Sequence, residues 1–214
     1  MKIVAALTDP SRAAEAEKQG ADLAELRIDL MDGDPARILR QYRRDCRLPV
    51  IVTLRSAPEG GRFFGDTEAW MEKIRPLLPF ADYIDIEQQF SRHAPEVREA
   101  GRKVIASFHT GAMMPLAALF EKERELRAFG DIPKIVITPQ TNADLVELVT
   151  FTEAAKKPII TGVMGSQFRY ARAVLPLFGS VFVYCHTGDP TAAGQYSVGE
   201  FVALRRLLDV PCGD

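Results

Sequence analysis

The sequence has few cysteines, no long hydrophobic run and almost no excess of charge. Cys46, Cys185 and Cys212 are an odd number at unrelated spacings, so they indicate neither a disulfide framework nor a zinc site. No apolar run approaches the roughly 18 residues of a membrane span, and the apolar start MKIVAALTDP is too short for a signal peptide. A net charge of −2 argues against nucleic acid or anionic membrane as partner. We expect a soluble, cytoplasmic protein.

A single recurring unit accounts for most of the chain. With 214 residues, 47% of them hydrophobic, the chain is long enough to bury a real core. Short β-rich runs alternate with amphipathic stretches, which indicates parallel strands joined by helices. The expected strands are 3–7, 22–28, 49–55, 82–87, 103–109, 134–138, 158–164 and 181–186, and the clearest helices are 11–19, 66–78, 141–156 and 197–208. Ser11 is the expected N-cap of the first helix and Gly20 its end.

Eight such units in 214 residues predict a small (β/α)8 TIM barrel that occupies residues 1–214 as a single domain. An open, doubly wound sheet is the alternative.

Polar side chains occur on one side of the expected barrel wall. Buried parallel strands are normally apolar throughout, yet five of these strands place ionisable groups at alternate positions, and the opposite positions are apolar. The ionisable set is Glu25, Arg27, Arg55, Asp85, Glu87, His109 and Lys134.

The apolar positions must face the helices, so the ionisable ones face the barrel axis. Most lie late in their strands, toward the C-terminal mouth where barrel active sites lie. Lys134 begins its run after Pro133, so we expect it lower, with its stem reaching upward. Each group has a structural explanation of its own: a buried ion pair, a core histidine, a solvated strand edge. Their convergence in one cleft favours a functional site.

This set of side chains suits a covalent reaction of a ketone. A lysine among arginines and apolar walls should have a lowered pKa, and a neutral amine attacks ketones to give a Schiff base. A nearby histidine can serve as general acid and base, oriented by a carboxylate such as Glu87. Several arginines indicate an anionic substrate. MGSQF at 164–168 is not a nucleotide-binding fingerprint, and a metal site built from His93, His109 and His186 is disfavoured because these residues lie on separate elements.

The chain resembles the short form of type I 3-dehydroquinate dehydratase over essentially its whole length. The matching pieces, in order, are ELRIDL (25–30), VTLRS with EGG after it (52–61), DYIDIE (82–87), VIASFH (104–109), PKIVITP (133–139), MG followed by R and FGS (164–180), and AGQ (193–195). Each piece is weak alone, but seven in order are specific. Phe168 and Ala171 stand where the family often has Gly and Ser, and Thr191 stands where Ser is common.

The resemblance implies a role for each matching residue. Lys134 would form the Schiff base with the C3 ketone of 3-dehydroquinate, His109 would be general base and then acid, and Glu87 would orient His109. Substrate would be held by Glu25, Arg27, Arg55, Arg172, Thr191 and Gln195. Spacing to FGS favours Arg172 over Arg169 as the carboxylate ligand. The product would be 3-dehydroshikimate, formed in aromatic amino acid biosynthesis with no cofactor or metal.

Two other functions use the same features. A class I Schiff-base aldolase would also use Lys134. It would need a glycine-rich phosphate-binding loop, however, and MGS (164–166) and TGD (187–189) match such a loop poorly. A binding module on a barrel gives no reason for a lysine opposite a histidine. A homodimer is left open: Phe120 and Phe129 could serve an interface or the core. The loop 187–196, rich in small residues, is expected to be a lid that closes over the small-molecule substrate.

Overall fold

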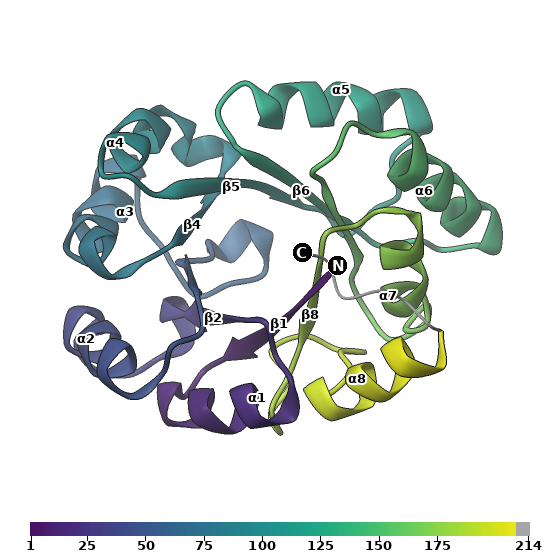
Figure 1. Cartoon of the computed structure of the whole chain (residues 1–214). Coiled ribbons are helices and arrows are strands. Elements are labelled where there is room, and N and C mark those ends of the chain that lie inside the picture. Colours follow the sequence, from purple (N-terminus) through teal and green to yellow (C-terminus); the bar gives the residue numbers. More distant parts are fainter. Residues whose placement is uncertain (209–214) are drawn as a thin grey trace.

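The computed structural model describes residues 1–208 and shows a barrel of parallel strands surrounded by helices (Figure 1). The strands are β1 (Lys2–Leu7), β2 (Leu23–Arg27), β3 (Val50–Thr53), β4 (Tyr83–Glu87), β5 (Lys103–His109), β6 (Ile132–Ile137), β7 (Ile160–Val163) and β8 (Phe182–Cys185). Each strand pairs in parallel with its neighbours in the order β7-β6-β5-β4-β3-β2-β1-β8. Next to β7 and β8, the Val181 amide donates to the Ile159 carbonyl at 2.9 Å. The predicted TIM barrel is confirmed, and the open sheet is not found.

Helices follow the strands and form the outer ring (Figure 1). They are α1 (Ala13–Gln19), α2 (Pro35–Asp45), α3 (Thr67–Ile74), α4 (Ala94–Glu99), α5 (Leu116–Arg127), α6 (Asn142–Ala154), α7 (Ala171–Val174) and α8 (Val198–Leu207), with 3₁₀ segments η1 (Pro10–Arg12), η2 (Ile28–Leu30), η3 (Ala57–Glu59), η4 (Arg75–Phe80), η5 (Gln88–His93) and η6 (Leu175–Phe178). Among residues 1–208, none of the helices combines the length and apolar character needed to cross a bilayer.

The start of the first helical segment differs from the prediction. Asp9, not Ser11, is the N-cap: its carboxylate accepts from the Ser11 amide at 2.9 Å and from the Ser11 hydroxyl at 2.7 Å. The reason is that Pro10 starts a 3₁₀ turn, which moves the cap two residues upstream. The other end agrees with the prediction, because Gly20 adopts a φ of 100° and its amide bonds to the last turn of α1.

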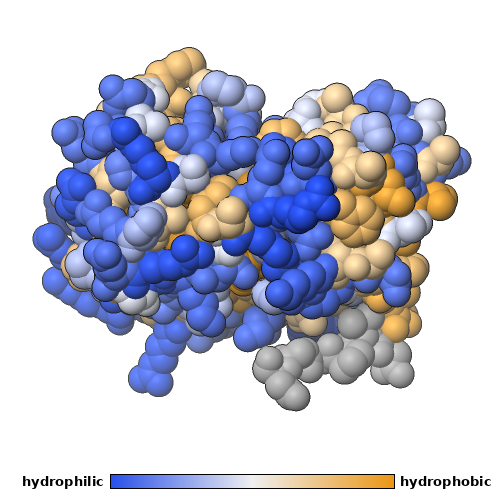
Figure 2. Space-filling model, turned by 90° about the horizontal axis from the view of Figure 1, so that it is seen from above, coloured by the Kyte–Doolittle hydropathy of each residue, from blue (hydrophilic) through white to orange (hydrophobic). Residues whose placement is uncertain are grey.

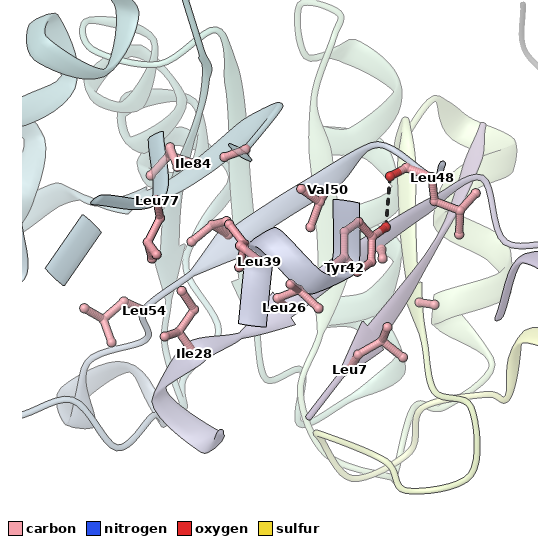
Figure 3. Close-up of a cluster of buried hydrophobic side chains, with 14 of the residues drawn as sticks. Leu7, Leu26, Ile28, Leu39, Tyr42, Leu48, Val50, Leu54, Leu77 and Ile84 are labelled. Atoms are coloured by element: carbon pink, nitrogen blue, oxygen red, sulfur yellow. Dashed lines mark hydrogen bonds between the residues drawn. The ribbon is translucent and has the colours of Figure 1, made fainter. Parts of the chain in front are cut away.

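The outward positions of the strands pack against the helices as their alternation predicts. In Figure 3, Leu26 and Val50 lie beside Leu39 and Tyr42 of α2, and Leu54 lies next to Ile28 in the same cluster. The Tyr42 hydroxyl donates to the backbone carbonyl of Leu48 at 2.9 Å, so the one polar atom of this ring has a partner in the core. The same packing holds α2 against the barrel and leaves the opposite side of each strand for the axis.

The inward positions form two levels. The lower level is an apolar floor of Leu23, Ile51, Ile105, Ile132, Ile160 and Phe182. Because side chains alternate along a strand, the next inward residue of each strand lies one step nearer the mouth. On that level lie Glu25, Thr53, Asp85, Ser107, Lys134 and Tyr184. The floor therefore closes the barrel beneath a layer of polar side chains.

Three details correct or complete the expectations. β6 begins at Ile132, two residues earlier than expected, so Lys134 is the third residue of a strand and only 5% exposed, not a residue at the strand start. Phe120 packs edge-on against Phe151 at a centroid distance of 5.1 Å, and Phe129 is also half-buried against the core. Of the cysteines, Cys46 and Cys185 are buried free thiols, and Cys212 lies outside the described residues.

Candidate active site

Lys134 lies on the barrel axis beside two carboxylates. Its Nζ donates to Asp85 Oδ2 at 3.0 Å and lies 3.8 Å from Glu25 Oε1, which also accepts from the Thr53 hydroxyl at 2.8 Å. The charges nearest to the amine are therefore carboxylates, not the guanidinium groups that the sequence suggested. The reason is the stagger of the strands, which brings Asp85 and Glu25 to the level of Lys134 while Arg55 points across to other partners.

Arg55 is the centre of a buried ionic network. Its Nη1 donates to Glu87 Oε1 at 2.9 Å and to the Ser107 hydroxyl at 3.0 Å, and its Nη2 donates to Asp85 Oδ1 at 2.9 Å. Burial acts to raise the pKa of Asp85, but Arg55 and Lys134 lower it below its ordinary value. Arg55 lines the cavity described below, but its guanidinium is largely committed to the protein. It holds the acidic side chains in place.

His109 is paired with Glu59 and not with Glu87. His109 Nδ1 lies 2.7 Å from Glu59 Oε2, and the His109 backbone amide donates to the same oxygen at 3.1 Å. Glu87 instead accepts from Arg55, from the Ser56 amide at 2.9 Å and from the Ser56 hydroxyl. The predicted contact between Glu87 and His109 is therefore absent from this structure. Arg55 and the Ser56 amide bind Glu87 Oε1, and the Ser56 hydroxyl and Gln89 Nε2 bind Oε2, so neither oxygen is free for the imidazole.

Glu59 reaches His109 from a tight turn after β3. η3 ends at Gly60, which has a φ of 85° and so occupies the left-handed region that favours glycine. At Gly61 a Cβ atom would lie 2.1 Å from the Arg55 carbonyl oxygen, so this approach also requires glycine. The EGG segment thus folds back on the end of β3 and carries the Glu59 carboxylate to the end of β5. The sequence contained this signal in its two glycines, but no periodic pattern pointed to Glu59 itself.

The protonation of this pair follows from its burial. Burial raises the pKa of Glu59 to about 8, against the attraction of Arg55. Burial, together with the charges of Arg55 and Lys134, lowers the pKa of His109 well below its ordinary value. The imidazole is therefore neutral at pH 7, the form in which a histidine accepts a proton.

The two candidate carboxylate ligands, Arg169 and Arg172, have different surroundings. Arg169 binds the Glu200 carboxylate at 3.0 Å and 3.1 Å and stacks on the Tyr196 ring, 4.0 Å from its centroid. Arg172 lines the central cavity, and its Nη2 donates to the Ala193 carbonyl at 3.2 Å. The buried Nε atoms of both arginines have no hydrogen-bond partner within residues 1–208, so the difference between them is that Arg172 lines the cavity and Arg169 does not. Arg172 thus has donor capacity left for an anion beside the cavity.

The loop after β8 lies over the same cavity. Thr191 and Gln195 line it, and Gln195 Oε1 accepts from the Thr191 amide at 2.9 Å. Arg12 holds the start of the loop, because its Nη1 donates to the Thr187 carbonyl at 2.6 Å. Thr191 and Gln195 therefore occupy positions from which they can contact a molecule inside the barrel mouth.

One cavity brings most of the predicted site together. Eight of the nine predicted residues line it, namely Glu25, Arg27, Arg55, His109, Lys134, Arg172, Thr191 and Gln195. Glu87 is the exception, and Glu59 lines the cavity in addition. The register of β5 and β6 explains why Lys134 and His109 meet there. Lys134 lies opposite Ser107, and His109 opposite Val136, one inward position nearer the mouth.

Tyr184 is a further cavity residue that the sequence did not reveal. The Lys134 Nζ lies 4.1 Å from the centroid of its ring, a cation–π arrangement. Its hydroxyl is buried and has no hydrogen-bond partner within the described residues. Burial, followed by the charges of Glu25 and Asp85, raises the pKa of this hydroxyl well above its ordinary value. An aromatic residue on a strand usually belongs to the hydrophobic core, so nothing in the sequence indicated that Tyr184 lines the cavity.

The other two histidines lie away from this chemistry. His93 is buried and stacks on Trp70 with ring centroids 6.1 Å apart, and His186 Nδ1 accepts from the Gly188 amide at 3.0 Å. Across residues 1–208, no three His, Cys, Asp or Glu side chains gather in a way that could hold a metal ion. The cavity itself is lined by an amine, an imidazole, carboxylates, guanidinium groups and the phenol of Tyr184.

Comparison with known proteins identifies the family of the chain. The family model of type I 3-dehydroquinase matches residues 6–210. The 3-dehydroquinate dehydratase of Methanoregula boonei is 62% identical over 97% of this chain and 100% of its own, and that of Methanospirillum hungatei JF-1 is 38% identical over 97% and 81%. The crystal structure of the 3-dehydroquinate dehydratase from Aquifex aeolicus VF5 superposes with a TM-score of 0.87 at 28% identity, covering 99% of this chain and 100% of that one. The chain therefore belongs to the type I 3-dehydroquinase family of hydro-lyases.

Proposed function

We propose that the protein dehydrates 3-dehydroquinate through a Schiff base on Lys134, with His109 as its general acid and base. The overall reaction, loss of water from 3-dehydroquinate, is that of the family to which the chain belongs. The residues that perform it are the proposal. The observation that carries it is the presence of Lys134 and His109 in one cavity, on neighbouring strands and one inward position apart.

The steps balance without a cofactor. The Lys134 amine adds to the C3 ketone, and loss of water gives a protonated imine. Neutral His109 takes a proton from C2, and the electron pair of that C–H bond flows toward the iminium nitrogen. The pair then returns to form the C1–C2 double bond as the C1 hydroxyl leaves, protonated by His109, as water. Hydrolysis of the imine consumes one water and releases 3-dehydroshikimate and the free lysine.

The surrounding residues support these steps. Glu59, bonded to Nδ1 of His109, fixes the ring so that Nε2 can face the substrate. Asp85 and Glu25 stand beside Nζ, where the positive charge of the iminium develops. Arg172 is the ligand for the substrate carboxylate, and Arg27, with Thr191 and Gln195, holds the ring hydroxyls. Arg55 binds Asp85 and Glu87, and these contacts keep Asp85 in place beside Lys134.

Borohydride reduction in the presence of substrate tests the proposal. Wild-type protein incubated with 3-dehydroquinate should acquire one covalent adduct at Lys134, located by peptide mass spectrometry. Lys134→Ala should acquire none and should lose turnover, measured by absorbance of the conjugated enone. A label at Lys122 or Lys156 would refute the assignment, and a label from a sugar phosphate in place of 3-dehydroquinate would favour an aldolase.

We propose three further properties of the protein: its domain organisation, its compartment and its oligomeric state. The described residues 1–208 fold around one barrel, in keeping with a single domain over residues 1–214. Cys46 and Cys185 are free and buried, as suits the reducing cytoplasm. Apolar residues gather on one side of the face in Figure 2, the side where Figure 1 shows α6. Val146 on α6 and Leu177 on neighbouring η6 are 65% and 46% exposed, which suits a homodimer that sedimentation would reveal.

A further inference from the structure

Asp29 is a fully buried carboxylate that neither the expected site nor the proposed mechanism uses. It follows β2 directly, in η2, and its side chain is 0% exposed. It accepts two hydrogen bonds from Arg27: Nε donates to Oδ1 at 2.9 Å, and Nη2 donates to Oδ2 at 2.7 Å. This fork is the strongest geometry that an arginine and a carboxylate form, and it fixes the plane of the guanidinium.

The carboxylate is itself held by the backbone. Its Oδ1 also accepts from the Arg55 amide at 3.3 Å, and its Oδ2 accepts from the Arg62 amide at 3.2 Å. These two amides lie on either side of the turn that carries Glu59, and this turn is closed by the Phe63 amide donating to the Arg55 carbonyl at 3.0 Å. Asp29 therefore cannot turn without breaking contacts to a second element of the barrel.

The fork with Asp29 uses two of the three guanidinium nitrogens of Arg27. Nε and Nη2 face the carboxylate, and among the described residues Nη1 has no hydrogen-bond partner, while Arg27 lines the cavity. A free arginine side chain has many rotamers, and ordering it on binding reduces affinity. A guanidinium already fixed by Asp29 avoids that loss.

We propose that Asp29 is a positioning residue, which orients the Arg27 guanidinium toward the substrate in the cavity. The inference rests on the proposed function, in which Arg27 contacts the substrate. Asp29 touches no substrate itself and acts through Arg27. An ion pair that only stabilised the fold would change thermal stability, but it would not change substrate binding specifically through Arg27.

A double-mutant cycle tests this role. Asp29→Asn keeps the size of the side chain but cannot accept both N–H groups of the fork. It should raise KM for 3-dehydroquinate about tenfold or more, the effect of a lost charge-assisted hydrogen bond, and change kcat much less. In an Arg27→Ala background the same substitution should change KM by less than about twofold, because the group it orients is gone. Asp32→Asn, an exposed carboxylate three residues away, is the matched control and should leave KM unchanged.

Arg27→Lys gives a second measurement that does not depend on the folding of an Asp29 variant. Lysine keeps the charge but cannot form the fork, so KM should rise toward the value for Asp29→Asn. Equal KM values for Asp29→Asn and wild type, or additive effects of the two substitutions, would overturn the inference. Wild-type trapping at Lys134 separates this failure from failure of the proposed function, because only the latter abolishes the label in the wild type.

Discussion

At the scale of single residues, two glutamates are candidates for the partner of His109, the proposed general base. Glu59 contacts His109 Nδ1, whereas Glu87 binds Arg55 and Ser56. Glu59→Gln should lower kcat by about tenfold to a hundredfold, the usual effect of losing a group that orients a catalytic imidazole, with little change in KM. Glu87→Gln should act mainly on thermal stability, since it breaks a buried ionic network. Steady-state kinetics and calorimetry of both variants measure these effects.

The comparison is decisive because both substitutions are isosteric. Each exchanges one carboxylate oxygen for an amide nitrogen without opening a cavity. If Glu87→Gln stayed folded and lost more kcat than Glu59→Gln, the expectation drawn from the sequence would be right. The contact between Glu59 and His109 would then be incidental to catalysis.

Arg172 and Arg169 offer a second residue-scale test. Arg172→Ala should raise KM about tenfold or more, because a charge-assisted hydrogen bond to the substrate carboxylate is lost. Arg169→Ala is the matched control: it removes a partly exposed pair with Glu200, which contributes little to binding. An unchanged KM for Arg172→Ala with a large rise for Arg169→Ala would show that the wrong arginine is assigned.

At the scale of elements, strand alternation predicts which side of the barrel wall a residue faces but not which partner it meets. Alternation placed Glu25, Asp85 and Lys134 on the axis, and the structure confirms this direction. Partners depend on strand stagger and side-chain length, which a pattern of period two does not contain. In the structure Glu87 therefore contacts Arg55 and Ser56 and not His109, and a role for Glu87 in orienting His109 stays a prediction. Glu59 was missed for a related reason: it lies in a 3₁₀ turn, where no periodicity exists to mark it.

The loop 187–196 gives the prediction at this scale. The loop is anchored at its start by Arg12, which contacts Thr187 and Asp189, and at its end by Tyr196, on which Arg169 stacks. Between these ends it is held by Arg172 on the Ala193 carbonyl and by hydrogen bonds between Thr191 and Gln195. Because Arg172, Thr191 and Gln195 also contact the substrate in the proposed mechanism, ligand and loop should order one another. Hydrogen exchange of residues 187–196 should slow at least about tenfold with a non-reactive substrate analogue. Helix α2, none of whose residues line the cavity, is the internal control and should not change, and equal protection of the loop in both states would rule out a lid.

At the scale of the whole molecule, the barrel interior concentrates charge that an apolar core would not contain. Glu25, Arg55, Asp85, Glu87 and Lys134 are all buried above the apolar floor. Such a group of charges stabilises the fold only while each charge keeps its partner. The apolar floor beneath it was predictable from sequence because hydrophobic burial is not directional. For the polar layer, the sequence predicted which residues face the axis but not which of them form pairs, because the energy of each pair depends on its geometry.

The free-energy cost of burying a charge can be measured at Glu59, as a dependence of protein stability on pH. Its pKa is raised from 4.5 to about 8 in the folded protein, so the folded state holds this proton more tightly than the unfolded state. The stability that this group contributes is complete below pH 4.5 and is lost as the pH rises through about 8. Glu59→Gln cannot ionise. The variant should therefore gain thermal stability relative to the wild type as the pH rises, with a larger difference in Tm at pH 8.5 than at pH 4.5.

Calorimetry at the two pH values measures the difference, and Glu72→Gln, at an exposed site, is the control that should show no such trend. His109 and Asp85, whose pKa values are lowered, act in the opposite direction. The stability that His109 contributes is lost as the pH falls below about 6.5, and that of Asp85 as the pH falls below about 3.8, the ordinary pKa values of these side chains. Both groups remain in the variant, so they largely cancel in its comparison with the wild type. A Tm difference that shrank with rising pH would contradict the raised pKa of Glu59. A difference that grew while kcat fell would show that the carboxyl group which orients His109 is retained at the expense of stability.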